Sequence, residues 1–186
     1  MARIAPVEPA QATPEVRSLY ETLRADLGIE PNNFFKTMAH NTELLKPLIE
    51  FSRAMLEGGD LPRRLKEWVI LQIGRAHDCA YVYNAHKMAL SRALMVDVLD
   101  ESAFGMDATS LKKEEQLAIR YASQITANSV DDETFKEVQA TFTPSELIEL
   151  TVLAGYYNFI CRTVNALQID TDKLTFLEPL PQEAKS

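Results

Sequence analysis

Apolar residues recur at helical spacing through almost the whole chain, from about residue 13 to about residue 167. Steps of three and four place these side chains on one face of an α-helix, and no segment alternates strictly enough to predict a strand. Glycine is scarce, with 6 in 186 residues, which argues against turn-dense β folds and against Gly-rich phosphate loops. The sequence therefore predicts an all-α fold.

Capping and turn residues divide this pattern into separate helices. Thr13 and Pro14 suit a helix start, Gly28 suits a helix end, and Thr143 with Glu146 has the spacing of a capping box. The residues Pro-Asn-Asn at 31–33 predict a turn. The predicted helices cover about 14–27, 43–56, 62–76, 79–94, 111–127, 132–141 and 144–167, with a short piece at 96–104. We expect a single domain over 1–186, with extended arms at 1–12 and 170–186 and a helical hairpin at about 62–94.

The charge balance and the cysteine count limit the class of protein. Lys and Arg number 19 against 27 Asp and Glu, a formal net charge of −8, whereas a nucleic-acid partner needs a basic patch. The first residues form no signal-peptide core, and no run of about 18 apolar residues predicts a membrane span. With two cysteines, Cys79 and Cys161, the chain is expected in a reducing cytoplasm, with neither nucleic acid nor membrane as partner.

The residues able to carry chemistry gather between Glu67 and His86. Asp78 is a good helix N-cap, which would place Cys79 in the first turn of the next helix. The positive end of a helix dipole favours the thiolate form of a cysteine there. His86 follows two turns later, so Cys79, Val82 and His86 share one helix face. A carboxylate, an imidazole and a thiol in one pocket can transfer protons near neutral pH.

The position of Glu67 on its own helix leaves two interpretations open. The apolar stripe of Leu65, Val69 and Ile73 leaves Glu67 off the main apolar face. One interpretation is therefore a solvated charge beside Lys66. The other is a buried carboxylate that a helical hairpin brings towards His86 or Cys79.

The spacing of Glu67, Cys79, Val82 and His86 resembles a known signature. In the peroxidase branch of the carboxymuconolactone decarboxylase and alkylhydroperoxidase D superfamily the pattern is Glu-x11-Cys-x2-Cys-x3-His. Three positions match in type and spacing, and Val82 stands where the second cysteine belongs. The resemblance covers about residues 50–170. It implies an all-α fold with the motif on a helical hairpin, Glu67 and His86 facing the site, and homo-oligomers that are dimers, trimers or hexamers.

The valine limits the thiol chemistry open to this chain. In the peroxidase cycle one thiolate is oxidised to a sulfenic acid, and a second cysteine resolves it as a disulfide. Val82 has no thiol, and Cys161 could replace it only if the two Cα atoms came within roughly 6 Å. A cycle with one cysteine and an external thiol is a further alternative, and the decarboxylase branch needs no cysteine pair.

Three functions follow from these observations. The preferred one is a carboxymuconolactone decarboxylase-like enzyme, a lyase without cofactor or metal that acts on a small carboxylated or carbonyl substrate. In it Glu67 and His86 transfer protons and Cys79 shapes the pocket. The alternatives are a thiol-dependent peroxidase that uses Cys79 and a non-catalytic module that binds a small ligand or assembles.

Residues around the motif supply the expected substrate contacts. Three residues of the second hairpin helix are expected to line the substrate site: Tyr81, Val82 and Tyr83. A carboxylated substrate also needs a cation, and Arg75 and Lys87 lie nearby in the sequence, although no motif places either. Arg162, in the last helix, is expected to pair with an acid across a subunit interface, because a cation among apolar neighbours needs a partner.

Overall fold

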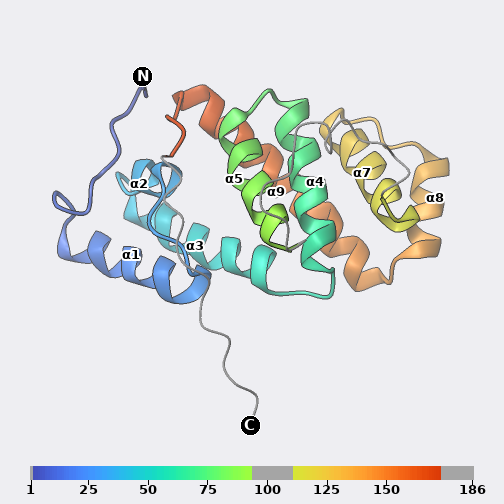
Figure 1. Cartoon of the computed structure of the whole chain (residues 1–186), viewed down its shortest axis with the longest axis horizontal. Coiled ribbons are helices and arrows are strands. Elements are labelled where there is room, and N and C mark those ends of the chain that lie inside the picture. Colours follow the sequence, from blue (N-terminus) through green and yellow to red (C-terminus); the bar gives the residue numbers. More distant parts are fainter. Residues whose placement is uncertain (1, 94–110, 173–186) are drawn as a thin grey trace, which may run out of the picture.

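The structure is a computed structural model that describes residues 2–93 and 111–172 (Figure 1). Over these residues it is helical and contains no strand, so the prediction of an all-α fold is confirmed. The helices are α1 (Pro14–Leu27), α2 (Asn33–Met38), α3 (Thr42–Glu57), α4 (Arg63–Ala76), α5 (Ala80–Ala93), α7 (Lys113–Thr126), α8 (Asp132–Thr141) and α9 (Pro144–Leu167). The predicted piece at 96–104 and the end of the C-terminal arm lie outside the described residues.

The predicted capping residues mark the helix ends in the structure. The Thr13 side chain accepts a hydrogen bond from the Val16 N–H at the start of α1, and Thr143 forms a capping box with Glu146 at the start of α9. Gly28 ends α1 with a φ of 62°, a left-handed conformation that glycine adopts without strain.

The predicted turn at 31–33 is wrong, because a short helix begins there. Asn32 is the N-cap of α2, and its side chain accepts a hydrogen bond from the Phe35 N–H. With only 6 residues, α2 is too short to show a helical period in the sequence. It buries Phe34 and Phe35, which fixes it against the core.

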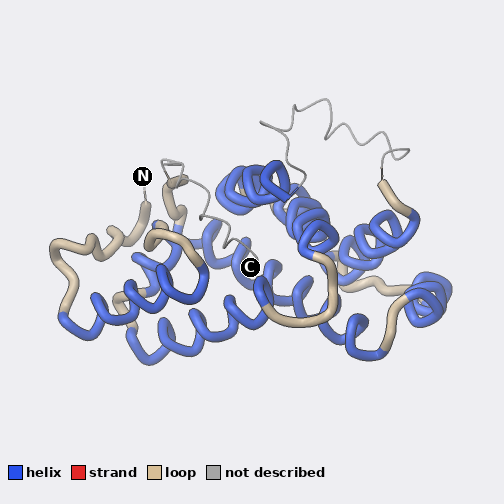
Figure 2. Tube along the Cα trace, turned by 60° about the horizontal axis from the view of Figure 1, so that its bottom comes forward, coloured by secondary structure: helices blue, strands red, loops and turns tan. Residues whose placement is uncertain are grey.

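α4 is the central element of the fold. It contacts α3, α5, α7 and α9, and Figure 1 shows the α4–α5 hairpin in the middle of the molecule, with α1–α3 on one side and α7 and α8 on the other. The turned view in Figure 2 shows the same chain as helices joined by loops. None of the described helices combines the length and the hydrophobicity that a membrane crossing needs.

Two apolar clusters form around α4. The main cluster joins residues of α1, α3, α4, α5 and α9, among them Val69, Ile73 and Leu153. A second cluster contains Trp68 and Leu71 of α4 together with Leu90 and Ile119. Because α4 contributes to both clusters, it is buried on several sides, and this decides the environment of Glu67.

Candidate active site

Glu67 lies inside the molecule. Its side chain is 0% exposed, because α5, α7 and α9 all pack against α4. The stripe of Leu65, Val69 and Ile73 marks only one of the buried sides of this helix. The interpretation of Glu67 as a solvated charge is therefore wrong, and the neighbouring Lys66 is buried as well.

Both oxygens of the Glu67 carboxylate have a side-chain partner. Arg63 Nε donates to Oε1 at 2.6 Å, and His86 Nδ1 lies 2.7 Å from Oε2. Burial alone would raise the pKa of Glu67, but His86 and Arg63 outweigh it and hold that pKa below its ordinary value. Arg63 is thus the cation that pairs with the motif carboxylate, and a role of Arg75 or Lys87 towards a substrate stays a prediction. The i, i+4 spacing on one helix is the sequence signal that points to it.

The contact with Glu67 orients His86. Since Nδ1 faces a carboxylate, the neutral ring carries its proton there and keeps a lone pair on Nε2. Among the described residues none hydrogen-bonds Nε2. The side chain is 16% exposed, and its ring meets that of Tyr157 edge-on, with centroids 4.9 Å apart. A carboxylate-held imidazole with one free nitrogen can accept or donate a proton.

Tyr157 of α9 belongs to this site although the motif spacing does not reach it. Burial, and then the charge of Glu67, raise its pKa well above the ordinary value, so the phenol is neutral. The charge of Cys161 acts in the same direction, which places Tyr157 near both Glu67 and Cys161. In the described part of the chain its hydroxyl has no hydrogen-bond partner.

The turn between α4 and α5 sets the position of Cys79. The Asp78 N–H donates to the Arg75 carbonyl, and the Cys79 N–H donates to the Gly74 carbonyl at 2.8 Å. These are the two hydrogen bonds of a Schellman motif, with Asp78 in the left-handed position at a φ of 48°. The prediction of Asp78 as an N-cap is wrong, because an N-cap needs an extended backbone. Cys79 directly precedes α5, and its carbonyl accepts the first helical bond, from the Tyr83 N–H.

The Cys79 thiol, at this N-cap position, faces the Cys161 thiol. Interaction with that thiol, and with the backbone N–H groups of Val82 and Tyr81, lowers the pKa of Cys79 to about 7, although burial opposes it. The contact with Cys79, together with burial, raises the pKa of Cys161. Of the two thiols, Cys79 is therefore the one that ionises first.

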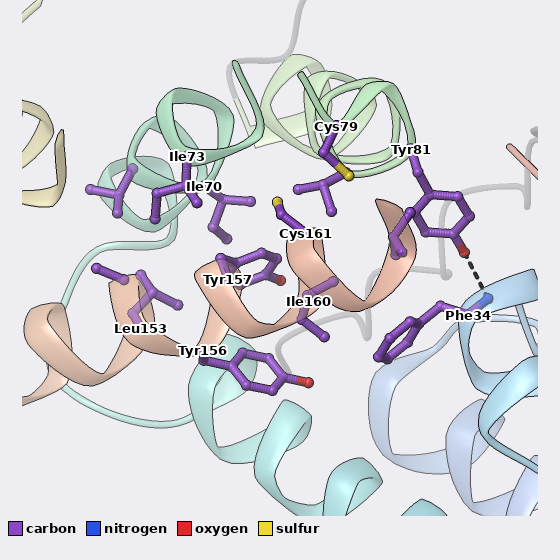
Figure 3. Close-up of a cluster of buried hydrophobic side chains, with 14 of the residues drawn as sticks. Phe34, Ile70, Ile73, Cys79, Tyr81, Leu153, Tyr156, Tyr157, Ile160 and Cys161 are labelled. Atoms are coloured by element: carbon purple, nitrogen blue, oxygen red, sulfur yellow. Dashed lines mark hydrogen bonds between the residues drawn. The ribbon is translucent and has the colours of Figure 1, made fainter. Parts of the chain in front are cut away.

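The two sulfur atoms face each other, one at the start of α5 and the other on α9 (Figure 3). Both cysteines are free, and they are 1% and 0% exposed. Tyr157 lies one helical turn before Cys161 on α9, and Val82 lies one turn before His86 on α5. The structure thus forms two pairs, Glu67 with His86 and Cys79 with Cys161, between the α4–α5 hairpin and α9.

The three residues expected to contact a substrate lie in different surroundings. The Tyr81 hydroxyl donates to Asp172 Oδ2 at 2.5 Å and accepts from the Phe34 N–H at 3.1 Å, so it ties the segment after α9 to α2. Val82 is buried in the main cluster, and Tyr83 packs against the second cluster. Their roles towards a substrate stay predictions, and the structure gives Tyr81 a clear structural one.

A cleft of about 260 Å³ opens beside the thiol pair. Its lining includes Asp78 and Ala80, which flank Cys79 in the chain, and Val164, which follows Cys161 by less than one turn of α9. Neither sulfur atom is part of its lining.

Arg162 lies apart from both pairs. It is exposed and lines a second cleft with Gly155 and Asn158, and within residues 2–93 and 111–172 it pairs with no acid. The expectation of apolar neighbours is therefore wrong, because positions 155, 158 and 162 share the outer side of α9. In the same two ranges, no three His, Cys, Asp or Glu side chains gather as a metal site requires.

No protein-family model and no curated protein matches the chain. Solved structures do match it. A peroxidase-related protein of Ralstonia eutropha JMP134, described as an alkylhydroperoxidase AhpD core, aligns with a TM-score of 0.77 at 16% identity over 92% of this chain and 93% of that one. A peroxidase-related protein of Silicibacter sp. TM1040 gives 0.75 at 18% identity over 91% and 92%. The debrominase Bmp8, in complex with 2,3,4-tribromopyrrole, gives 0.75 at 18% identity over 91% of each chain.

At such low identity these likenesses concern the fold, and they extend over nearly the full length of both chains. They agree with the expectation drawn from Glu67, Cys79 and His86, whose spacing implied a helical hairpin fold. The chain therefore has an AhpD-like helical fold.

Proposed function

We propose that the chain reduces hydroperoxides by thiol chemistry at Cys79. The observation that carries the proposal is the N-cap position of this cysteine, directly before α5, where its sulfur faces that of Cys161 (Figure 3). A thiolate, and not a thiol, is the nucleophile that attacks a peroxide. With a pKa of about 7, a large share of Cys79 is ionised at neutral pH. The geometry thus favours the peroxidase alternative over the lyase that the sequence favours.

The proposed reaction uses both pairs of the site. The Cys79 thiolate attacks the terminal oxygen of a hydroperoxide, and the O–O bond breaks as the S–O bond forms. Sulfur is oxidised to a sulfenic acid, and the peroxide is reduced to an alcohol or water, which takes up one proton. We assign this proton to His86: its Nε2 first takes up the proton that the Cys79 thiol releases and then donates it to the leaving oxygen, while Glu67 holds Nδ1. To Tyr157 we assign a hydrogen bond to the bound hydroperoxide. An external dithiol then reduces the oxidised sulfur.

The contact between Glu67 and His86 favours a second candidate, the cofactor-free lyase on a small carboxylated or carbonyl substrate. An imidazole held by a carboxylate at one nitrogen and free at the other transfers protons without any thiol. The two candidates therefore differ in one requirement, which is the need for Cys79.

Consumption of hydrogen peroxide and of cumene hydroperoxide, with dithiothreitol as reductant, tests the proposal. We expect Cys79→Ser to abolish turnover, and His86→Gln to lower kcat/KM by about 100-fold, the usual size of a general acid–base contribution. His40→Gln is the matched control, since His40 is exposed and binds only the Ala5 carbonyl.

Full peroxide turnover by Cys79→Ser would overturn the proposal. If that variant also turns over a carbon-acid substrate that His86→Gln does not, the lyase is the correct function.

A further inference from the structure

We propose that Cys161 is the second reacting thiol of this site and that it closes a disulfide with oxidised Cys79, joining α5 to α9. The inference rests on the proposed function, because it needs Cys79 to be oxidised first. It moves the resolving thiol of the site from the motif helix to a helix about 80 residues further along the chain.

The placement of the two cysteines carries the inference. Their sulfur atoms point towards each other from two helices that pack together (Figure 3). Both residues lie in the main apolar cluster, which also contains Val82, Tyr157 and Ile160. A disulfide needs Cα atoms within about 7 Å, so the proposal requires α5 and α9 to hold the two cysteines within that limit.

The chain offers no other partner for Cys79. It contains two cysteines in all, and the motif position that would carry a second thiol holds Val82, which is buried at 2% exposure. An intramolecular disulfide in this chain can therefore only join Cys79 to Cys161. A monomer that has lost two hydrogen atoms by forming a disulfide must therefore contain this one.

The protonation of the two thiols assigns their roles. Cys79 has the lowered pKa and stands at the start of α5, whereas the pKa of Cys161, within α9, is raised. The first attack on a hydroperoxide therefore belongs to Cys79. Cys161 stays protonated until Cys79 has been oxidised to the sulfenic acid.

The resolving step balances without a further oxidant. The Cys161 sulfur attacks the Cys79 sulfur, the S–S bond forms, and the S–O bond of the sulfenic acid breaks. The departing hydroxide takes the proton of the Cys161 thiol and leaves as water. An external dithiol afterwards returns two electrons and two protons, in two exchange steps through a mixed disulfide. The cleft beside Asp78 and Val164 gives a small dithiol its approach.

The first experiment uses the unaltered chain. It is treated with one equivalent of hydrogen peroxide, free thiols are blocked by alkylation, and the intact mass and a non-reducing peptide map are recorded. We expect a monomer on a non-reducing gel that has lost two hydrogen atoms, carries no alkyl group, and yields one linked peptide pair containing both cysteines.

Two variants at position 161 separate the roles of this thiol. Cys161→Ser keeps a hydrogen-bond donor beside Cys79 but cannot form a disulfide, so we expect it to stop at the sulfenic acid, which a cyclic 1,3-diketone traps on Cys79. Adding Val82→Cys to that variant returns a thiol to the motif position. We expect the double variant to regain the loss of two hydrogen atoms and to lose the diketone label.

Each outcome bears on a different claim. If the unaltered chain takes up the diketone as fully as Cys161→Ser does, and Cys161 stays open to alkylation, the disulfide is ruled out while peroxide reduction at Cys79 stands. If peroxide oxidises Cys79 in neither protein, the proposed function fails and this inference fails with it. A disulfide that links two chains, seen as a dimer on the non-reducing gel, likewise overturns the proposed disulfide between Cys79 and Cys161 of one chain.

Discussion

At the scale of single residues, the acidity of Cys79 depends on a neighbour from another helix. The donor from Cys161 is the largest contribution to its lowered pKa of about 7. A group that hydrogen-bonds the thiolate stabilises the charged form, so loss of that donor raises the pKa. We expect the rate of Cys79 alkylation by iodoacetamide to rise with a midpoint near pH 7 in the unaltered chain.

Substitution at position 161 tests this dependence. Cys161→Ala removes the donor and should move the midpoint upwards, whereas Cys161→Ser retains a donor and should hold it lower than the alanine variant does. An unchanged midpoint in Cys161→Ala would mean that the N–H groups of Tyr81 and Val82 suffice on their own.

Glu67 makes the stability of the protein depend on pH. Its folded pKa lies below the ordinary value of 4.5, so its contribution is complete above that value and is lost as the pH falls through the folded pKa. We expect Glu67→Gln to lower the free energy of unfolding by about 2 kcal/mol at pH 7, since it removes charged hydrogen bonds to Arg63 and His86. The difference from the unaltered chain should shrink below pH 4.5 in urea unfolding series.

Glu57→Gln is the matched control for that substitution. Glu57 also binds Arg63, at 2.8 Å, but its side chain is 50% exposed. An exposed ion pair contributes less than about 1 kcal/mol, so this variant should stay close to the unaltered chain at every pH. Equal losses in the two variants would contradict a special role for the buried carboxylate.

At the scale of elements, the turn between α4 and α5 is held in a conformation that its residue does not prefer. Asp78 has a φ of 48°, a region in which a residue with a Cβ carries strain of roughly 1 kcal/mol and glycine does not. We expect Asp78→Gly to be about 1 kcal/mol more stable towards urea than Asp78→Ala. Both variants lack the aspartate side chain, so the comparison isolates the backbone. A more stable alanine variant would contradict the left-handed turn.

Local signals predicted the elements that depend on them. Thr13, Gly28 and Thr143 mark helix ends through bonds to residues a few positions away, and the structure places them so. Asp78 shows the limit of such signals, because the same residue type suits an N-cap and a left-handed helix end. The two differ in the path of the chain after the turn, which packing between α4 and α5 decides.

The site was predictable where it follows one hairpin. The spacing from Glu67 to His86 indicated that they share a pocket, and the structure brings them into contact. The burial of Glu67 and the arrival of Cys161 and Tyr157 depend on α7 and α9, which lie far along the chain. A local sequence pattern does not predict which face of a distant helix will pack on α4.

At the scale of the whole molecule, α9 fixes the loop between α3 and α4. Glu149 accepts hydrogen bonds from the N–H groups of Asp60 and Leu61 at 2.7 and 3.0 Å, and it pairs with buried Lys66. Gly59 makes room for it: a Cβ there would lie 2.3 Å from the Glu149 carboxylate, and the φ of Gly59 is 83°. The loop therefore requires glycine at this position for space and for backbone conformation.

We expect Gly59→Ala to lower the free energy of unfolding by about 3 kcal/mol, since it displaces one partner of a buried ion pair. Gly155→Ala is the matched control, because a Cβ there meets nothing within 4 Å and alanine favours the interior of α9. Chemical denaturation measures both. If Gly59→Ala lowers the free energy of unfolding no more than Gly155→Ala does, the loop tolerates the added carbon and the expectation is wrong.

The long interval between Cys79 and Cys161 has a consequence for the denatured chain. A covalent link between them would enclose a loop of about 80 residues, which covers nearly half of the sequence. Such a loop restricts the unfolded ensemble by roughly 4 to 5 kcal/mol in the chain-entropy model. The oxidation state of one buried cysteine pair would then change the free energy of unfolding, so the melting temperature of the protein would depend on the surrounding redox potential.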